Sequence, residues 1–265
     1  MGPTSTPLRS PARRAPSRTT GVAWGGADAA ARIAELKGWA RSARELDMVA
    51  RGGAATKAES AAKVLETLIT TMELRPGETL TVDTLCAILE MGRTPVRDAV
   101  KQLEADGLLT LQKRTGIAIR RLENDDMAEI MAVRRALEHV ATVHAIRNGT
   151  LQRRAFLVEI GVEIREAAIC GDVRRFMQLG LIAYKRMLEA AQNEFLTRPL
   201  LSTYSLSRRL YLSRVADRSE TVEAARLHHE RFRAIAAGDE EQGRVATDGL
   251  MDFLVGFGAP GQDPS

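Results

Sequence analysis

Residues 92–109 read GRTPVRDAVKQLEADGLL, and this stretch decides the fold. Its apolar residues recur at i, i+3, i+4 and i+7, on one face of a helix: Val96, Ala99, Val100 and Leu103. Arg93, Arg97 and Lys101 fall on another face, with Thr94 beside them. Such a helix suits the DNA major groove, where Arg binds guanine edges and Thr binds phosphate. A solvated basic helix in any small domain would show the same pattern.

The neighbouring segments favour the DNA-binding interpretation. An amphipathic helix is expected over residues 61–72, and Thr81 can N-cap a short second helix. After the basic helix, two β-prone runs flank a basic turn that contains Thr115 and Gly116, which predicts a hairpin. Three helices followed by a basic-tipped hairpin form a winged helix-turn-helix, whose wing touches the DNA backbone or minor groove.

The same residues resemble the winged helix of the GntR family of bacterial transcription regulators. The resemblance covers residues 58–122 and rests on Arg93-Thr94-Pro95-Val96-Arg97-Asp98-Ala99, Leu103-Glu104-Ala105-Asp106-Gly107-Leu108 and Gly116. One departure is Gly92, where the family has a Ser or Thr that caps the helix and contacts phosphate. We expect six residues to bind DNA: Arg93, Thr94, Arg97, Lys101, Thr115 and Gly116.

Composition and charge agree with this division. The 265 residues have room for two modest domains, and a hydrophobic content of 45% supports a real core. Residues 1–122 contain 19 Lys and Arg against 13 Asp and Glu, whereas residues 123–265 contain 19 against 21. The basic half is therefore the half with the winged helix, as nucleic-acid binding requires.

Both ends of the chain are expected to be disordered tails. Residues 1–57 form a basic extension, in which one loosely amphipathic helix is possible near residues 28–51. This extension could add non-specific DNA affinity as a flexible polycation, or it could be passive. Residues 259–265 are expected to form a second, short tail.

Two observations bear on the compartment. No apolar run approaches the ~20 residues needed to span a bilayer, and the N-terminus lacks the apolar segment of a signal peptide. Cys86 and Cys170 lie in apolar helical contexts, so buried free thiols are expected rather than a disulfide. Both observations fit the reducing cytoplasm.

The second half of the chain, residues 123–258, reads as helical almost without interruption. Five breaks divide it into about six helices with no strand, at Gly149, Gly171, Gln192-Asn193, Ala216-Asp217 and Gly238-Asp239. Short connections predict an antiparallel bundle. The run from Met131 to Glu138 resembles the start of the FCD domain of the FadR subfamily, and six helices suit its VanR-like branch. This resemblance implies that the bundle binds an effector and forms a homodimer.

The same resemblance raises the question of a metal. Many FCD domains hold one with an Asp and three His on three helices. Aligned on Asn193 and on Gly238-Asp239, those four positions hold Leu181, Lys185, His228 and Leu250. Because one ligand of four remains, we expect neither a bound metal nor another cofactor.

Three cationic groups are expected to face the apolar interior of the bundle, namely Arg134, Lys185 and His228. A buried charge without a partner is costly, so a small organic acid would be a fitting ligand. Each residue also has a plainer role. Arg134 could pair with Glu138 or contact the DNA-binding domain, Lys185 could extend into solvent, and His228 could be a hydrogen-bonded core histidine.

The sequence therefore predicts a mainly α protein, a winged helix-turn-helix followed by an all-α bundle. Its predicted function is that of a dimeric cytoplasmic regulator of transcription, which binds palindromic double-stranded operator DNA under the control of a small organic effector. The alternative is a ligand-blind regulator whose bundle serves only for dimerisation. An enzyme is not expected, because the chain has no Gly-rich phosphate loop, no G-x-S-x-G and no paired carboxylates with metal spacing.

Overall fold

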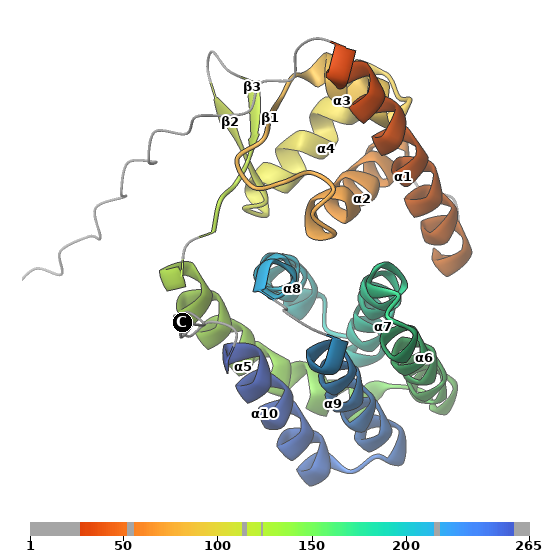
Figure 1. Cartoon of the computed structure of the whole chain (residues 1–265). Coiled ribbons are helices and arrows are strands. Elements are labelled where there is room, and N and C mark those ends of the chain that lie inside the picture. The colour runs from red at the N-terminus through yellow and green to blue at the C-terminus, as the bar shows by residue number, and fades with distance from the viewer. Residues whose placement is uncertain (1–26, 52–55, 113–115, 123, 215–217, 257–265) are drawn as a thin grey trace, which may run out of the picture.

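The computed structural model describes residues 27–51, 56–112, 116–122, 124–214 and 218–256. These ranges form the two units that Figure 1 draws one above the other. The upper unit contains α1 (Ala27–Arg51), α2 (Lys57–Thr70), β1 (Thr79–Leu80), α3 (Val82–Leu89), α4 (Arg93–Ala105), β2 (Leu109–Gln112) and β3 (Gly116–Ile119). The lower unit contains α5 (Asn124–Asn148), α6 (Leu151–Cys170), α7 (Val173–Ala191), α8 (Glu194–Arg214), α9 (Arg218–Ala237) and α10 (Glu240–Gly256). The prediction of a winged helix-turn-helix followed by a six-helix bundle is confirmed.

Local chemistry starts and orients the helices of the upper unit. A capping box begins α2, since Thr56 and Glu59 each bind the other's backbone N–H. Thr81 caps α3 by accepting a hydrogen bond from the backbone N–H of Thr84 at 3.0 Å, as the sequence predicts. The four apolar residues of the α4 stripe, residues 96, 99, 100 and 103, are all buried against the core that α2 shares. The burial of this stripe leaves the basic face of α4 turned outward.

A three-stranded antiparallel sheet in the order β1-β3-β2 completes this unit. The predicted hairpin is β2 paired with β3, while the two-residue strand β1 was too short to be recognised in the sequence. Gly116 begins β3 with a φ of +95°, and a Cβ there would lie 2.5 Å from the carbonyl oxygen of Leu80. Glycine is therefore required at this position by the close approach of β1.

Helix α1 coincides with the helix that the sequence offered near residues 28–51, but it packs on the winged helix, which an extension without a core was not expected to do. The tail up to residue 26 lies outside the described residues, but α1 is an ordered helix that packs on α2 and α3. Leu36, Ala40 and Ala43 fall at i, i+4 and i+7 and are buried in the core of the winged helix. The buried stripe consists of only one leucine and two alanines. It therefore adds little to the amphipathicity of the segment, and the sequence did not reveal it.

The lower unit is an antiparallel bundle around one apolar core, whose larger members include Phe176, Tyr184 and Phe232. Four of the five predicted breaks separate consecutive helices, at Gly149, Gly171, Gln192-Asn193 and Gly238-Asp239. The fifth break, Ala216-Asp217, and the C-terminal tail lie outside the described residues. Within the described helices, none is both long and apolar enough to cross a membrane.

The two cysteines are free thiols, but their surroundings differ from the expectation of burial. Cys86 is half-buried on α3, and Cys170 is exposed at the C-terminal end of α6. The prediction for Cys170 was wrong because this end of α6 is uncovered, so that the neighbouring Ile169 is 49% exposed as well.

Candidate nucleic-acid interface and buried cavity

The outward face of α4 carries the predicted DNA-binding side chains. Arg93, Thr94, Arg97 and Lys101 are all exposed, and no side chain caps the helix at Gly92. Arg93 is the one member of this set with an ion pair among the described residues, to Asp83 on α3 at 2.8 Å. The face is thus cationic, accessible and anchored from behind by the buried stripe, which is what a recognition helix needs.

Of the two wing residues predicted to bind DNA, the structure describes Gly116. Gly116 is half-buried, and its place follows from the backbone of β1 rather than from DNA. Thr115 lies outside the described residues, so its predicted contact remains a prediction. The outer strand β2 does expose Leu111 at 49%, beside the recognition helix, whose Glu104 accepts a hydrogen bond from the Leu111 N–H.

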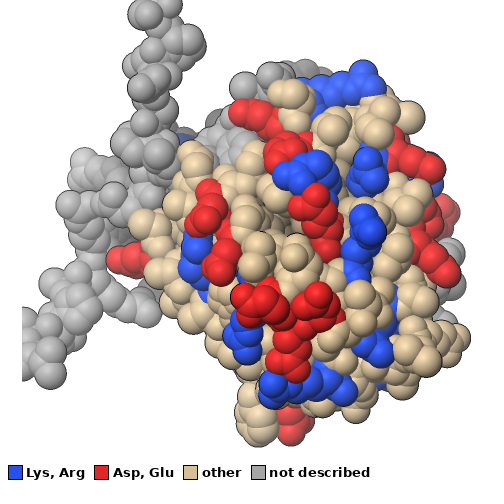
Figure 2. Space-filling model, turned by 90° about the horizontal axis from the view of Figure 1, so that it is seen from below, with Lys and Arg blue, Asp and Glu red and all other residues tan. Residues whose placement is uncertain are grey.

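Charge is distributed differently at the far end of the molecule. Figure 2 views the structure from below, at the end of the bundle remote from the winged helix. Acidic and basic side chains are interspersed on this face, with an acidic cluster near its centre. The bundle end seen there lacks the continuous basic surface that a phosphate backbone would favour.

A small cavity lies inside the bundle, with a volume of about 30 Å³. Its polar lining comes from three helices, and the residues that matter below are Arg134 on α5, Tyr204, Ser207 and Arg208 on α8, and His228 on α9. The remaining walls are mainly apolar, including Phe176 and Met177 of α7. This volume accepts a group of the size of a carboxylate or one or two waters.

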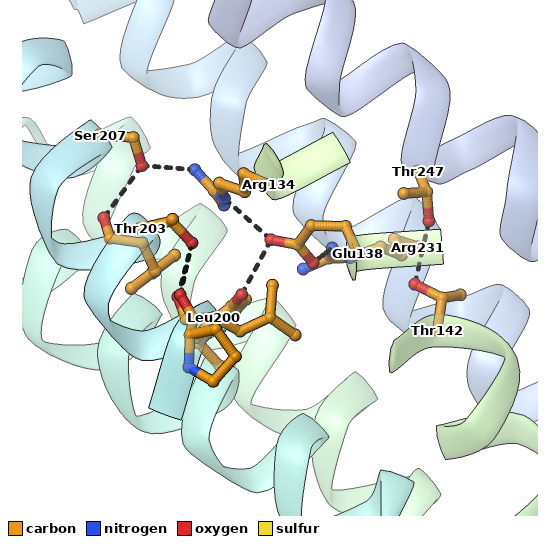
Figure 3. Close-up of polar contacts among 11 residues, drawn as sticks. Arg134, Glu138, Thr142, Leu200, Thr203, Ser207, Arg231 and Thr247 are labelled. Atoms are coloured by element: carbon orange, nitrogen blue, oxygen red, sulfur yellow. Dashed lines mark hydrogen bonds and ion pairs between the residues drawn. The ribbon is translucent and has the colours of Figure 1, made fainter. Parts of the chain in front are cut away.

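A buried ion network supports one wall of this cavity (Figure 3). Arg134 donates from Nε to Glu138 Oε1 at 2.9 Å and from Nη1 to the Ser207 hydroxyl at 2.7 Å. Arg231 donates from Nη1 to Glu138 Oε2 at 2.6 Å, and the Tyr184 hydroxyl donates to Oε1 at 3.0 Å. The pair Arg134–Glu138 that the sequence offered as an alternative is therefore present, in addition to the place of Arg134 at the cavity.

Positive charge exceeds negative charge in this region. Three guanidinium groups are buried here, those of Arg134, Arg208 and Arg231, and only Arg134 and Arg231 pair with the buried carboxylate of Glu138. Arg134 Nη2, Arg208 Nη1 and Arg231 Nε and Nη2 are buried with no hydrogen-bond partner among the described residues. Tyr204 offsets part of this cost, since its ring lies 4.9 Å from the Arg134 guanidinium and 5.2 Å from that of Arg208.

His228 experiences the same excess of charge. Burial lowers the pKa of its imidazole well below the ordinary value, and the charges of Arg231, Arg134 and Arg208 lower it further. The ring is therefore neutral at pH 7 and can offer the cavity one donor and one acceptor. Of the three predicted effector-binding residues, the structure brings Arg134 and His228 together.

Lys185, the third predicted effector-binding residue, does not line this cavity, so the expectation that it faces the apolar interior of the bundle is wrong. It lines a groove of about 860 Å³ between the two units, where its Nζ lies 3.7 Å from Glu66 Oε2 on α2. A loose motif alignment placed Lys185 on the buried side of α7, but its charge finds a partner in the winged-helix unit instead. In place of Lys185, the structure puts Arg208 at the cavity.

Helix α8 separates the cavity from the winged helix and contacts both. Tyr204, Ser207, Arg208 and Tyr211 fall at i, i+3, i+4 and i+7 and line the cavity. This polar stripe is the signal that could have revealed Arg208 in the sequence. The opposite face of α8 holds the upper unit through residues 202, 205, 206 and 209.

The contacts of that opposite face are specific. The Ser202 hydroxyl donates to the carbonyl oxygen of Asp106, the C-cap of the recognition helix, at 2.8 Å. The Ser205 hydroxyl donates to Glu66 Oε1 at 2.5 Å, and Leu206 enters the core of the winged helix. One helix thus joins the cavity wall directly to the end of α4.

The four aligned metal positions do not form a ligand set. Leu250 is buried in the apolar core and Leu181 packs against it. Across the described part of the chain, no three His, Cys, Asp or Glu side chains come together to hold a metal ion.

The fold and these two sites define a class of protein, a DNA-binding regulator that joins a winged helix to a helical bundle. Comparison with family models gives the same result. Residues 57–119 match the bacterial regulatory proteins of the gntR family, and residues 129–253 match the FCD domain. The chain belongs to the GntR family, with the FCD bundle of its FadR-type members.

Individual relatives agree. The chain is 30% identical over 158 residues to the Nta operon transcriptional regulator of Aminobacter aminovorans, an alignment that covers 59% of this chain and 70% of the relative. Two solved structures share the fold. E. coli McbR/YncC aligns with a TM-score of 0.66 and 22% identity over 75% of this chain and 95% of its own. A GntR regulator from Rhodococcus sp. RHA1 aligns with a TM-score of 0.62 and 20% identity over 78% and 100%.

The buried network leads to a prediction about stability. Burial alone raises the pKa of Glu138, but the charges of Arg231 and Arg134 and their hydrogen bonds outweigh burial and hold it below its ordinary value. Glu138→Gln leaves buried guanidinium groups without a counter-charge, so the free energy of unfolding at pH 7 should fall by about 3–5 kcal/mol. Glu163→Gln, which breaks an exposed pair with Arg175, should cost less than about 1 kcal/mol in the same urea titration.

The same measurement has a pH dependence. Because the pKa of Glu138 is lower in the folded chain, its stabilisation is present at neutral pH and is lost as the pH falls through the folded pKa. Glu138→Gln should therefore lose less stability on acidification than the wild type. Equal acid sensitivity of the two proteins would contradict the role given to this carboxylate.

Proposed function

We propose that this protein is a homodimeric, cytoplasmic transcription regulator whose affinity for a palindromic operator is set by a small organic anion in the bundle cavity. The observation that carries the proposal is the two-sided role of α8, with Arg208 at the cavity and Ser202 at the end of the recognition helix. A ligand that binds Arg208 on one face of α8 would therefore also affect the contact that Ser202 makes on the other face.

The DNA half of the proposal rests on α4. Arg97 and Lys101 are exposed and have no ion pair among the described residues, so their charges remain available for bases and phosphates. Thr94, near the uncapped N-terminus, is a further candidate for phosphate, and Thr115 would join it from the wing. Two copies related by a two-fold axis would present two such helices to successive major grooves, which explains a palindromic site.

The proposal of an anionic ligand rests on the excess of buried positive charge in the bundle. Arg134 and Arg208 line the cavity, and each has a buried donor without a partner among the described residues, which would gain a charge-assisted hydrogen bond from a carboxylate. An anion would also relieve the excess of three guanidinium groups over one carboxylate. His228 would complete the site as a neutral hydrogen-bond partner. Beyond a carboxylate group, a larger ligand requires apolar side chains such as Phe176 to move.

The coupling between the two sites needs only a modest energy. Allosteric coupling of about 1–3 kcal/mol changes affinity 5- to 150-fold. The groove of about 860 Å³ between the units leaves the winged helix room to shift when α8 moves. The effector would then change the spacing of the two recognition helices in the dimer.

A second candidate is a ligand-blind regulator in which the bundle serves only for dimerisation. The small size of the cavity, about 30 Å³, and the existing pairing of Arg134 with Glu138 favour it. The distinction is experimental, because an effector that binds the folded chain raises its melting temperature.

The DNA-binding assignment predicts the effect of Arg97→Ala. Duplexes selected from a randomised pool by the full-length wild type should contain an inverted repeat. Arg97→Ala should weaken binding to the selected duplex by about 1–3 kcal/mol and relax the preference at one base position. Arg244→Ala, which removes an exposed arginine from α10, should change neither. Unchanged affinity and specificity in Arg97→Ala at fixed salt would contradict the assignment.

The effector assignment predicts the effect of Arg208→Met. In a thermal-shift screen running from formate and acetate to larger mono- and dicarboxylic acids, at least one acid should raise the melting temperature. An acid at 100 times its Kd stabilises by about 2.7 kcal/mol. The shift should vanish in Arg208→Met and with the corresponding amide, yet persist in Lys185→Met. A shift undiminished in Arg208→Met would remove Arg208 from the site, and the absence of any shift would favour the ligand-blind regulator.

A further inference from the structure

An ion pair ties the start of the recognition helix to the helix before it. Arg93 is the first residue of α4, and Asp83 lies in the first turn of α3. The Arg93 Nη2 atom lies 2.8 Å from Asp83 Oδ1 and 2.9 Å from Oδ2. Both side chains are about two thirds exposed, at 64% and 67%, so the pair stands on the surface that would face DNA.

An acid in the first turn of α3 interacts favourably with the helix dipole, by about 0.3–1 kcal/mol, so stability gives Asp83 only a modest role. An exposed ion pair contributes about 0–1 kcal/mol, because water screens the charges and ordering both side chains costs entropy. Close to DNA the same carboxylate is repelled by every neighbouring phosphate. If α4 bound DNA through charge alone, Asp83 would lower its affinity without compensation.

The pair does change what Arg93 can bind. The carboxylate offsets part of the charge that would attract a phosphate, and it holds the guanidinium plane in one orientation. Only Nη2 is engaged, so Nε and Nη1 keep their donors free. A guanine presents two acceptors, O6 and N7, to such a fixed pair of donors in the major groove.

Cys86 shows that these charges form one cluster. Burial raises the pKa of its half-buried thiol, the charge of Asp83 raises it further, and the charges of Arg93 and Arg97 lower it. Together with the 2.8 Å contact between Arg93 and Asp83, this places the acid beside the first basic residue of the recognition face.

We propose that Asp83 is a positioning residue that directs Arg93 to a guanine of the operator and away from phosphate, so that Asp83 helps to set base specificity. This inference rests on the operator-binding function proposed above. It assigns to an acidic residue of α3 a part in discrimination that the basic stripe of α4 alone does not supply.

The test compares duplexes selected from a randomised pool by full-length wild type, Asp83→Asn, Arg93→Ala and the double variant. The wild type should enrich a half-site containing one guanine that Arg93→Ala no longer requires. Asp83→Asn should lower discrimination at that base about tenfold, the effect of loosening one bidentate contact. It should at the same time raise affinity for unrelated duplex, since one negative charge is lost. In the Arg93→Ala background, Asp83→Asn should change discrimination less than about twofold.

Asp98→Asn is the charge-matched control, because it removes an exposed carboxylate from α4 itself. It should raise affinity for all duplexes and leave the preference at the guanine intact. Discrimination that is unchanged in Asp83→Asn, or equally lowered without Arg93, would overturn the inference, provided that thermal unfolding shows each variant to be folded. Failure of the wild type to enrich any sequence would instead overturn the operator-binding function, and the inference with it.

Discussion

Helix α8 must pack against two different partners, the interior of the bundle and the winged-helix unit. Most of the molecule is arranged around that constraint. One of its faces completes the wall of a cavity inside the bundle, through Arg208 and Ser207. The other face reaches the winged helix, where Ser202 binds the carbonyl group that ends α4 and Leu206 enters the core. Because the two faces belong to one rigid element, neither unit can change its packing on α8 without affecting the other.

The cavity face of α8 also explains the unusual charge of the bundle interior. Three guanidinium groups are buried in this region, and the carboxylate of Glu138 pairs with two of them, so donors of all three are left without partners among the described residues. Such a site would favour an anion and repel a divalent cation. Positive charge that a metal supplies in many FCD domains would here come from the protein's own arginines, and His228 would remain as a neutral hydrogen-bonding group. The sensor and the DNA-binding unit would then respond to the same ligand through one helix.

The parts of the fold that could be predicted are those with local signals. The apolar stripe of α4, the Thr81 cap and the glycine breaks of the bundle all depend on residues within one or two turns, so the sequence alone predicts them. The position of Lys185 was predicted wrongly because its partner, Glu66, lies on a distant helix, and no local pattern in the sequence identifies that contact. Arg208 was missed for a different reason. Its polar stripe on α8 is local, but the opposite face of α8 also carries polar side chains, so the stripe does not stand out in the sequence.

The central claim is that α8 transmits ligand binding to the recognition helix. It is tested most directly by the affinity of the selected duplex for Ser202→Ala/Ser205→Ala, measured by fluorescence anisotropy with and without a stabilising acid. The account predicts that the acid still binds, as calorimetry would show, but that its effect on duplex affinity falls from at least about fivefold to nearly none. Thr203→Ala, whose hydroxyl bonds only within α8, should retain the wild-type effect. A double variant that binds the acid and keeps the full effect on duplex affinity would contradict the account.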